Sequence, residues 1–426
     1  KTMSTILLVV VALAVAGGIT YFLMKKGKIA DANNNNIPDA IEEKVEEVKA
    51  FSIENVKDLY SSSSKIKELI ASFTENCRIH LTGLSGSSDA LVATACYNNF
   101  PGNYLFILTD KEEAAYFYND LQNLISPNRV FFFPHSEKLP YEHHDLDDEH
   151  FTGKKSEGES GLMRAEVLSA VNTRKRHFVI VSYAEALSEK VVTKQSLVKN
   201  TLTIQVGDGL SQEFINEMME ELEFERTDYV YEPGQFAIRG GIVDIWSFSN
   251  ERPFRVELFG EEVDSLRTFD PVTQLSVKDH GHISIIPDVQ KQAMKEVRQS
   301  FLEYLPDDTA IWLKNFELIQ DYVQKAFERA QEKFDGLKTS VRQLAPDEIY
   351  LSEEGYLDEL SKFSIVEFDR PSIFKADVEI RFNQTPQASF NKNFDLLISD
   401  LANHTRNGFY NYIFASNPKQ IARLHQ

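Results

Sequence analysis

Between residues 51 and 192, short apolar runs typical of strands alternate with segments whose hydrophobic positions have the period of a helix. Short apolar runs predict strands at Ile79–Thr82, Tyr104–Leu108, Val130–Phe133 and Phe178–Val181. Helical periodicity separates these runs, at Ala90–Tyr97, Glu112–Leu124 and Gly161–Val171. Apolar strands that alternate with amphipathic helices are typical of a parallel sheet covered on both faces. The pattern therefore predicts an α/β fold.

From about residue 202 the pattern changes to one helix followed by closely spaced strands. The helix is expected at Gln212–Leu222, and Pro233-Gly234 and Gly240-Gly241 supply turn signals. The expected strands are Tyr229–Tyr231, Phe236–Arg239, Ile242–Trp246, Phe254–Phe259 and Ser265–Phe269. Such spacing predicts a small antiparallel α+β domain with the helix on one side.

After Pro287 the alternation of helix and strand resumes, with strands expected at Ala310–Leu313, Glu348–Leu351 and Tyr412–Ala415. The parallel sheet is therefore expected to be interrupted by the small domain and then continued. The last residues before Gln426 are similar to the start of a helix, so we expect the natural sequence to extend further.

The amino-terminal segment has a different character. Ile6–Met24 is a run of 19 mostly apolar residues, which as a single helix would span roughly 28 Å, about one hydrocarbon core. Lys25, Lys26 and Lys28 follow directly, and such charges hold the downstream chain in the cytoplasm. The order of charge and apolar run predicts an uncleaved membrane anchor instead of a signal peptide.

Oxygen-bearing side chains follow at alternate positions, as a calcium loop requires. The candidate ligands are Asp31, Asn33, Asn35, Asp39 and Glu42. The usual central glycine is replaced by Asn36. A polar linker is the preferred interpretation, because short matches of this kind arise by accident.

Composition limits the classes of partner. The formal net charge is −20, so the surface as a whole repels phosphate backbones and favours a protein partner over broad binding to DNA. The two cysteines, Cys77 and Cys96, are too few for a disulfide framework and indicate small core residues in a reducing compartment.

A glycine-rich loop follows the first predicted strand, where a phosphate-binding loop would lie. Its residues include Gly83, Gly86, Ser87, Ser88 and Asp89. The signature ends in Gly-Lys-Ser/Thr, because the lysine neutralises phosphates and the hydroxyl holds magnesium. Here no cation is supplied or visible nearby, and Asp89 would repel a polyphosphate. We interpret the loop as a lost nucleotide site or as a plain turn that caps a helix. Both interpretations exclude ATP.

A second polar cluster lies between residues 135 and 150. It contains His135, His143, His144, Asp145, Asp147, Asp148 and His150. Histidines of this kind can bind zinc or nickel, but nothing fixes a tetrahedral set and no cysteine joins it. A solvated loop is the preferred interpretation.

The most specific run extends from Phe224 to Gln274 and contains Arg226, Arg239 and Trp246. Exposed arginine with a large aromatic residue is typical of an interaction hot spot, and no catalytic arrangement accompanies it. The alternative is that the arginines only pair with nearby acids such as Glu232 and Glu257.

This run resembles the second domain shared by the transcription-repair coupling factors (Mfd) and the repair helicase UvrB. The resemblance rests on Pro-Gly-Gln-Phe-Ala-Ile-Arg-Gly-Gly at 233–241 and on Glu-Leu-Phe-Gly-Glu-Glu-Val-Asp-Ser-Leu-Arg-Thr-Phe-Asp at 257–270. It extends from roughly Phe51 to the end and includes Phe133-Pro-His-Ser-Glu-Lys-Leu-Pro-Tyr141 and the remnant of the phosphate loop.

The resemblance implies that Arg226, Arg239 and the aromatic position of Trp246 contact UvrA. The family usually has phenylalanine at the last position, and a further UvrB arginine is Ala237 here. UvrB itself is disfavoured, because its ATP loop and its tyrosine-rich hairpin are absent. The family's ATP- and Mg-dependent motor, and its contacts with RNA polymerase and DNA, would lie beyond residue 426.

We therefore expect four segments: a transmembrane-like helix and linker (1–50), a UvrB-like domain 1a with the degenerate phosphate loop (51–200), a UvrA-binding domain 2 (201–288) and an incomplete domain 1b (289–426). The expected function is a cytoplasmic, non-enzymatic module that needs no cofactor and recruits UvrA to stalled RNA polymerase in nucleotide excision repair. The alternatives are an active UvrB-like helicase subunit and a scaffold tethered to the membrane through residues 6–24.

Overall fold

The computed structural model describes residues 8–9, 53–74, 76–136, 141, 157–173, 177–289, 293, 297–337, 344–368, 374–391, 393–409, 411 and 413–414. The chain divides into two compact units. The larger unit contains residues 67–383, and the smaller combines residues 1–66 with residues 384–426.

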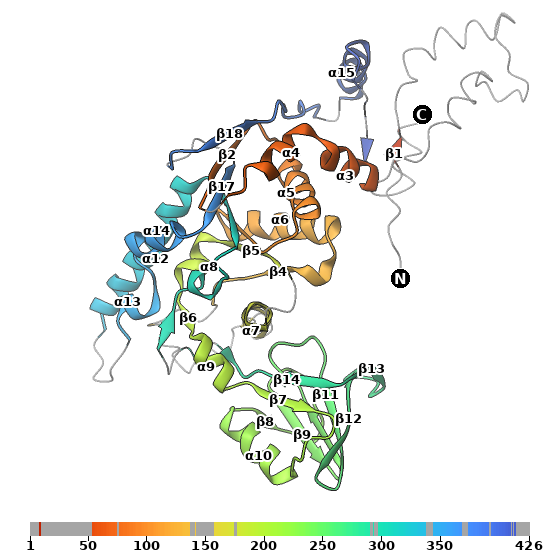
Figure 1. Ribbon diagram of the computed structural model, residues 1–426, viewed down its shortest axis with the longest axis vertical. Coiled ribbons are helices and arrows are strands. Elements are labelled where there is room, and N and C mark those ends of the chain that lie inside the picture. The colour runs from red at the N-terminus through yellow and green to blue at the C-terminus, as the bar shows by residue number, and fades with distance from the viewer. Residues whose placement is uncertain are drawn as a thin grey trace, which may run out of the picture. The chain divides into compact units, whose positions relative to one another are not determined.

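A seven-stranded, entirely parallel sheet forms the centre of the larger unit (Figure 1). Its order is β18-β2-β17-β16-β3-β5-β4. The strands are β2 (Arg78–Thr82), β3 (Tyr104–Leu108), β4 (Val130–Phe132), β5 (Val179–Tyr183), β16 (Ala310–Lys314), β17 (Ser364–Phe368) and β18 (Val378–Arg381). Every residue of β3 and β5 is buried, as expected for strands covered on both faces. The α/β fold predicted from the sequence is confirmed.

Helices follow the strands on both faces of this sheet. Crossover connections place α5 (Ser88–Asn99) and α6 (Lys111–Leu124) on one face, and α12 (Phe316–Asp335) and α14 (Glu353–Leu360) on the other. The side chain of Asp110 caps α6 by accepting a hydrogen bond from the Glu113 amide at 2.9 Å. Outside the small domain, the other described elements of the unit include η1 (Pro127–Arg129), α7 (Glu157–Thr173), α8 (Ala184–Ser188), β6 (Val191–Val192), α9 (Lys194–Lys199), β15 (Arg298–Gln299), η2 (Leu302–Tyr304) and α13 (Pro346–Ile349).

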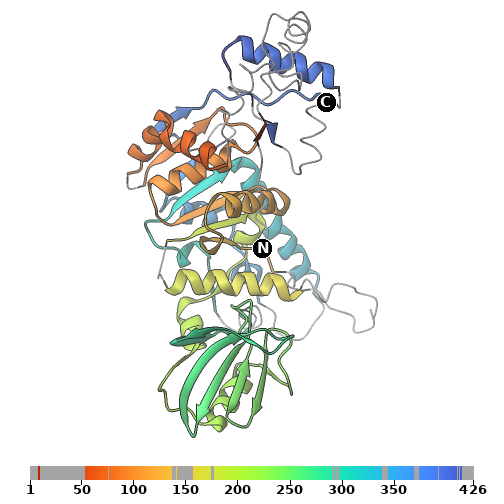
Figure 2. The same ribbon diagram turned by 90° about the vertical axis from the view of Figure 1, so that its right-hand side faces the viewer.

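The small domain is inserted between β5 and β16 of the parallel sheet. Its six-stranded sheet has the order β13-β12-β11-β10-β9-β8, and a separate pair joins β7 (Leu202–Gln205) to β14 (His282–Ile285). The six strands are β8 (Glu225–Arg226), β9 (Gln235–Arg239), β10 (Ile242–Ile245), β11 (Phe254–Phe259), β12 (Glu262–Phe269) and β13 (Ser276–His280). All neighbours are antiparallel except β8 and β9. Figure 2 shows this sheet in green, with α7 in yellow crossing beside one end of it.

One face of the six-stranded sheet is packed against α10 (Gln212–Glu221), as predicted. Ile215 and Met219 of the helix join Phe236, Val243 and Val256 of the strands in one buried cluster. Because side chains alternate along a strand, the residues between these positions lie on the opposite face, which we call the outer face.

Two predicted strands are wrong. Tyr229–Tyr231 forms no strand, because the side chain of Gln235 accepts the Tyr231 and Glu232 amides that a ladder would use. Glu348–Leu351 is replaced largely by the helical turn α13, which begins at Pro346, and proline suits the first helical position. The side chain of Glu348 supports this turn by accepting the Ala345 amide at 2.7 Å.

The predicted amino-terminal helix falls almost entirely outside the described residues. Within Ile6–Met24 the structure describes only Leu8–Val9, which form the strand β1 paired with β19 (Ile413–Phe414), and the rest lies outside the described residues. No helix in the described part of the chain is long and apolar enough to cross a bilayer. The other described helices outside the larger unit are α3 (Ile53–Ser62) and α15 (Phe394–Arg406), while α4 (Ser64–Ala71) spans the boundary.

Candidate functional site: the outer face of the small domain

The hairpin formed by β9 and β10 positions two of the predicted contact residues. Gly240 has a φ of +58°, which favours glycine, and a Cβ at Gly241 would lie 2.8 Å from the Leu258 carbonyl oxygen. The tight turn fixes the register, so that Arg239 pairs with Ile242 and Ala237 pairs with Asp244. Alternation then places Arg239, Asp244 and Trp246 on the outer face.

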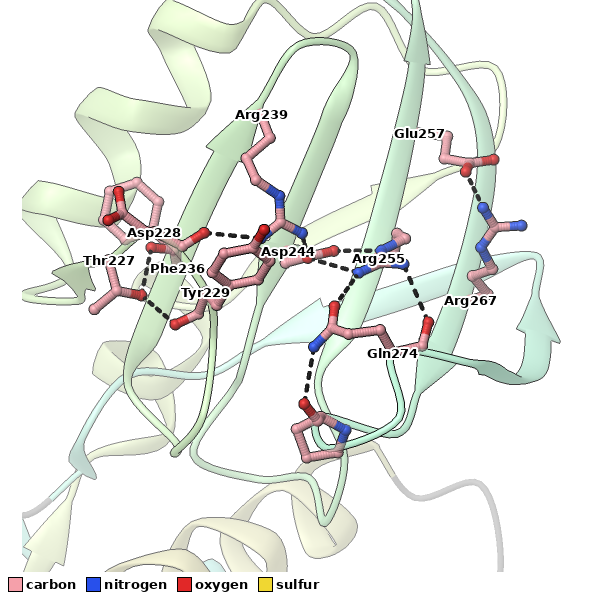
Figure 3. A network of polar contacts seen from close by, with 11 residues as sticks. Thr227, Asp228, Tyr229, Phe236, Arg239, Asp244, Arg255, Glu257, Arg267 and Gln274 are labelled. Atoms are coloured by element: carbon pink, nitrogen blue, oxygen red, sulfur yellow. Dashed lines mark hydrogen bonds and ion pairs between the residues drawn. The ribbon is translucent and has the colours of Figure 1, made fainter.

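A buried carboxylate organises this face (Figure 3). The side chain of Asp244 is only 1% exposed and accepts hydrogen bonds from Arg239 on β9 and Arg255 on β11. The Arg255 contact is bidentate, with Nε at 2.7 Å and Nη2 at 2.8 Å from the two carboxylate oxygens. These hydrogen bonds raise the pKa of Arg255 above its usual value. Gln274 accepts a further bond from Arg255 at 2.8 Å.

Arg239 is therefore partly committed within its own domain. Its Nη2 binds Asp244, its Nη1 donates to the Asp228 carbonyl oxygen at 2.8 Å, and its guanidinium lies 4.3 Å from the centre of the Tyr229 ring. Its side chain is 30% exposed. The sequence left open that Arg239 pairs with a nearby acid, and the structure shows such a pair. The acid is Asp244, however, and neither Glu232 nor Glu257.

Arg226 has a different environment. It lies on the edge strand β8, is exposed, and donates a hydrogen bond from Nη1 to the Asn216 side chain of α10 at 3.0 Å. It forms no ion pair with any residue that the structure describes. Its register partner on β9 is Phe236, whose side chain is in the core beneath α10. Arg226 and Arg239 therefore flank the same sheet edge from opposite faces.

Trp246 is half-buried just beyond β10. Its indole Nε1 donates to the Asn250 carbonyl oxygen at 2.9 Å, and its backbone pairs with Gly234 and Gln235. Ala237, where the resemblance leads one to expect an arginine, is buried beside Asp244. Arg255 supplies a second arginine for this carboxylate from the neighbouring strand.

Two glycines of the glycine-rich loop adopt the left-handed backbone conformation. Gly83 has a φ of +71°, and a Cβ there would overlap the carbonyl oxygen of Phe382. Gly86 has a φ of +60° but faces open space. The hydroxyl of Ser88 is turned back to accept the Ser85 amide at 2.8 Å, while Ser87 precedes α5 without a capping side-chain bond.

A cation does approach this loop, contrary to the interpretation of the sequence. Lys314 ends β16 and contacts Asp89 of α5 at 3.2 Å and Glu113 of α6 at 2.6 Å. All three lie at the carboxyl edge of the parallel strands, where α/β proteins bind ligands. Lys314 is thus paired with carboxylates of the protein itself, where a phosphate-loop lysine would face a nucleotide.

The titration of these groups reflects their mutual contact. Burial raises the pKa of Asp89, with Lys314 opposing the effect. Burial also acts to raise the pKa of Glu113, but hydrogen bonds from Lys314 and Thr109 outweigh it and the pKa is lowered. Burial acts to lower the pKa of Lys314, but the two carboxylates outweigh it and the pKa is raised. Lys314 therefore stabilises the charges of both carboxylates, and they stabilise its own.

The remaining candidate sites lie largely outside the described residues. These are the calcium candidate Asp31, Asn33, Asn35, Asp39 and Glu42, and the cluster members His143, His144, Asp145, Asp147, Asp148 and His150. His135 is described, and its Nδ1 lies 2.5 Å from the Tyr183 hydroxyl. The described part of the chain holds no group of three metal-ligating side chains.

Several residues that organise both sites were missed from the sequence. Asp244 and Arg255 each lie between apolar residues of a predicted strand. This alternation of polar and apolar residues could have indicated that both side chains share the face of the sheet opposite the core. Lys314 directly follows the predicted strand Ala310–Leu313. This position could have indicated that Lys314 lies at the carboxyl edge of the parallel sheet. Nothing local in the sequence indicates that Tyr229 covers Arg239, because that contact depends on the path of a loop.

Comparison with known proteins agrees with the resemblance seen in the sequence. Residues 202–290 match the family described as the UvrB interaction domain. The chain is 26% identical over 268 residues to the transcription-repair-coupling factor of Bacillus subtilis, covering 62% of this chain and 22% of that protein. It is 24% identical over 208 residues to the same-named protein of Escherichia coli, covering 48% and 17%. It is also 24% identical over 235 residues to the UvrABC system protein B of Methanosarcina acetivorans, covering 53% and 35%.

The predicted resemblance to the amino-terminal part of the transcription-repair coupling factors is thereby confirmed. The chain spans about a fifth of the length of the Bacillus subtilis protein and about a third of the length of the Methanosarcina protein. The similarity therefore concerns a module of these proteins.

The loop geometry predicts unequal costs for two glycine substitutions. Gly83→Ala should destabilise the protein by about 3 kcal/mol or more, because the added methyl meets backbone that cannot move cheaply. The matched variant Gly86→Ala should cost only the left-handed strain of about 1 to 2 kcal/mol. Urea unfolding of both variants measures the difference, and equal losses would contradict the close approach to Phe382.

The pairing of Lys314 predicts a further stability effect. Lys314→Met should cost about 3 kcal/mol, because it leaves two partly buried carboxylates together without a cation. Adding Asp89→Asn and Glu113→Gln to the same chain should restore most of the loss. Lys325→Met is the control, since Lys325 is 60% exposed in an ion pair on α12. If urea unfolding shows Lys314→Met to be as stable as the parent, the cluster has no structural role.

Proposed function

We propose that this chain is a docking module that binds UvrA through the β8–β9 edge of its small domain and thereby recruits nucleotide excision repair. The match of residues 202–290 to the UvrB interaction domain supports this proposal. So do the repair proteins to which the chain is similar. RNA polymerase and DNA would then be partners of the longer proteins, through parts that this chain does not cover.

One structural observation carries the assignment of the surface. Arg226 is exposed at a sheet edge and has an amide side chain, instead of a carboxylate, as its hydrogen-bond partner. Its charge is therefore available to a carboxylate of a partner, and charge-assisted pairs of this kind are among the strong contacts of interfaces. The rest of the chain is strongly acidic, which favours a protein over a nucleic acid at this surface.

We also infer that this chain does not use ATP. Lys314, the described cation in contact with Asp89, is paired with two carboxylates. A polyphosphate at the start of α5 would face Asp89 and Glu113, and the Coulomb repulsion at this edge is weakly screened. The module would therefore act by binding alone and would be no enzyme.

Removal of either arginine is expected to weaken binding to UvrA. Arg226→Ala and Arg239→Ala should each cost about 2 kcal/mol, roughly 30-fold in Kd. Arg255 keeps its bidentate contact with Asp244, so Arg239→Ala should remain folded. Arg329→Ala is the control, because Arg329 is an exposed arginine of α12. Titration of purified UvrA measures the effect, and unchanged affinity in both variants would defeat the assignment.

Direct binding of nucleotide separates the proposal from its main rival, an active helicase subunit. Equilibrium dialysis of the chain with labelled ATP and Mg²⁺ should show no saturable binding at about 1 mM nucleotide, a range that covers typical KM values. Saturable binding that Lys314→Met abolishes would instead favour the helicase subunit.

A further inference from the structure

The loop between β8 and β9 presents two neighbouring tyrosines. Tyr229 is 47% exposed and Tyr231 is 66% exposed, and their ring centres lie 6.4 Å apart. Val230 between them is 1% exposed and anchors the loop in the domain. Tyrosine and arginine are among the residues most enriched in interface hot spots, so this combination is unusual for a surface without a partner.

The loop is held in place by its own hydrogen bonds. The Thr227 hydroxyl donates to the Tyr229 carbonyl oxygen at 2.9 Å, and the Tyr231 amide donates to the Gln235 side chain at 3.0 Å. Gly234 has a φ of +86° and closes the loop before β9. A surface that is ordered before binding loses less conformational entropy on association. Tyrosine adds to this effect because its side chain is large and has few torsions.

The guanidinium of Arg239 lies next to Tyr229 of this loop (Figure 3). Its two terminal nitrogens each bond within the domain, to the Asp228 carbonyl oxygen and to Asp244. The ring of Tyr229 covers its guanidinium at 4.3 Å. The internal bonds use one of the two N–H donors on each terminal nitrogen, and together with the Tyr229 ring they fix the plane of the guanidinium within the domain. Arg239 is therefore better placed to hold Tyr229 than to bind a partner by itself.

We propose that Tyr229 and Tyr231 are the principal contact residues of the docking surface and that Arg239 is a positioning residue that acts through Tyr229. This inference rests on the proposed function and concerns the same partner, UvrA. The loop directly follows Arg226 and connects β8 to β9, so the tyrosines and that arginine lie at the same edge of the small domain, although Arg226 is on the α10 face of the sheet and Arg239 is on the outer face. The complementary surface would have apolar walls for the rings, an acceptor for a phenolic hydroxyl and a carboxylate for Arg226.

The test is a titration of UvrA with single and paired variants of the full chain. Tyr229→Ala should weaken binding by at least the roughly 30-fold expected for Arg239→Ala, and Tyr231→Ala should weaken it at least tenfold. Tyr229→Phe, which keeps the ring over the guanidinium, should bind within threefold of the parent. The matched control is Tyr116→Ala on α6, where the tyrosine is 68% exposed, and it should leave the affinity unchanged.

A double-mutant cycle separates positioning from direct contact. If Arg239 acts through Tyr229, the pair Tyr229→Ala and Arg239→Ala should bind no more weakly than Tyr229→Ala alone. Strictly additive losses would overturn the positioning role. If both tyrosine variants bind within twofold while Arg226→Ala weakens binding, the contact role of the tyrosines is wrong and the proposed function stands. If the parent chain does not bind UvrA at all, both fall.

Discussion

The ion pairs of Asp244 are the interaction on which the docking surface depends. A carboxylate that is 1% exposed would be strongly destabilising without partners, and two arginines from adjacent strands supply them. Arg255 holds the carboxylate from β11, and Arg239 holds it from β9. The same contact fixes the plane of Arg239, on which the ring of Tyr229 lies. A buried charge thus determines the shape of an exposed surface.

Charged side chains are also paired within the protein beside the glycine-rich loop of the parallel sheet. The loop has two left-handed glycines before α5, and Lys314 of β16 contacts Asp89 and Glu113 beside it. Lys314 therefore balances the charge of two protein carboxylates at this edge of the sheet. In our account this edge of the sheet is a structural support for the module, and the chemistry of recruitment lies in the small domain.

Much of this organisation could be predicted from sequence because it depends on local period and turn chemistry. The strands Tyr104–Leu108 and Phe254–Phe259 were predicted with the observed bounds, since a continuous apolar run defines the first and turn signals separate the second from its neighbours. The path of residues 229–231 was not predictable from β-propensity, because a side chain of Gln235 replaces the ladder. Likewise, the sequence contained Arg239 and Asp244 but not their contact, which arises across a hairpin and beneath a loop.

Hydrogen–deuterium exchange of the chain with and without UvrA tests the central claim most directly, because it reports the contact surface without altering it. New protection is expected to be concentrated in residues 225–239, at the edge that carries Arg226 and the tyrosine loop. Exchange at the carboxyl edge of the parallel sheet, around Asp89 and Lys314, should be unchanged. Protection confined to the parallel sheet, with none in residues 225–239, would contradict the account.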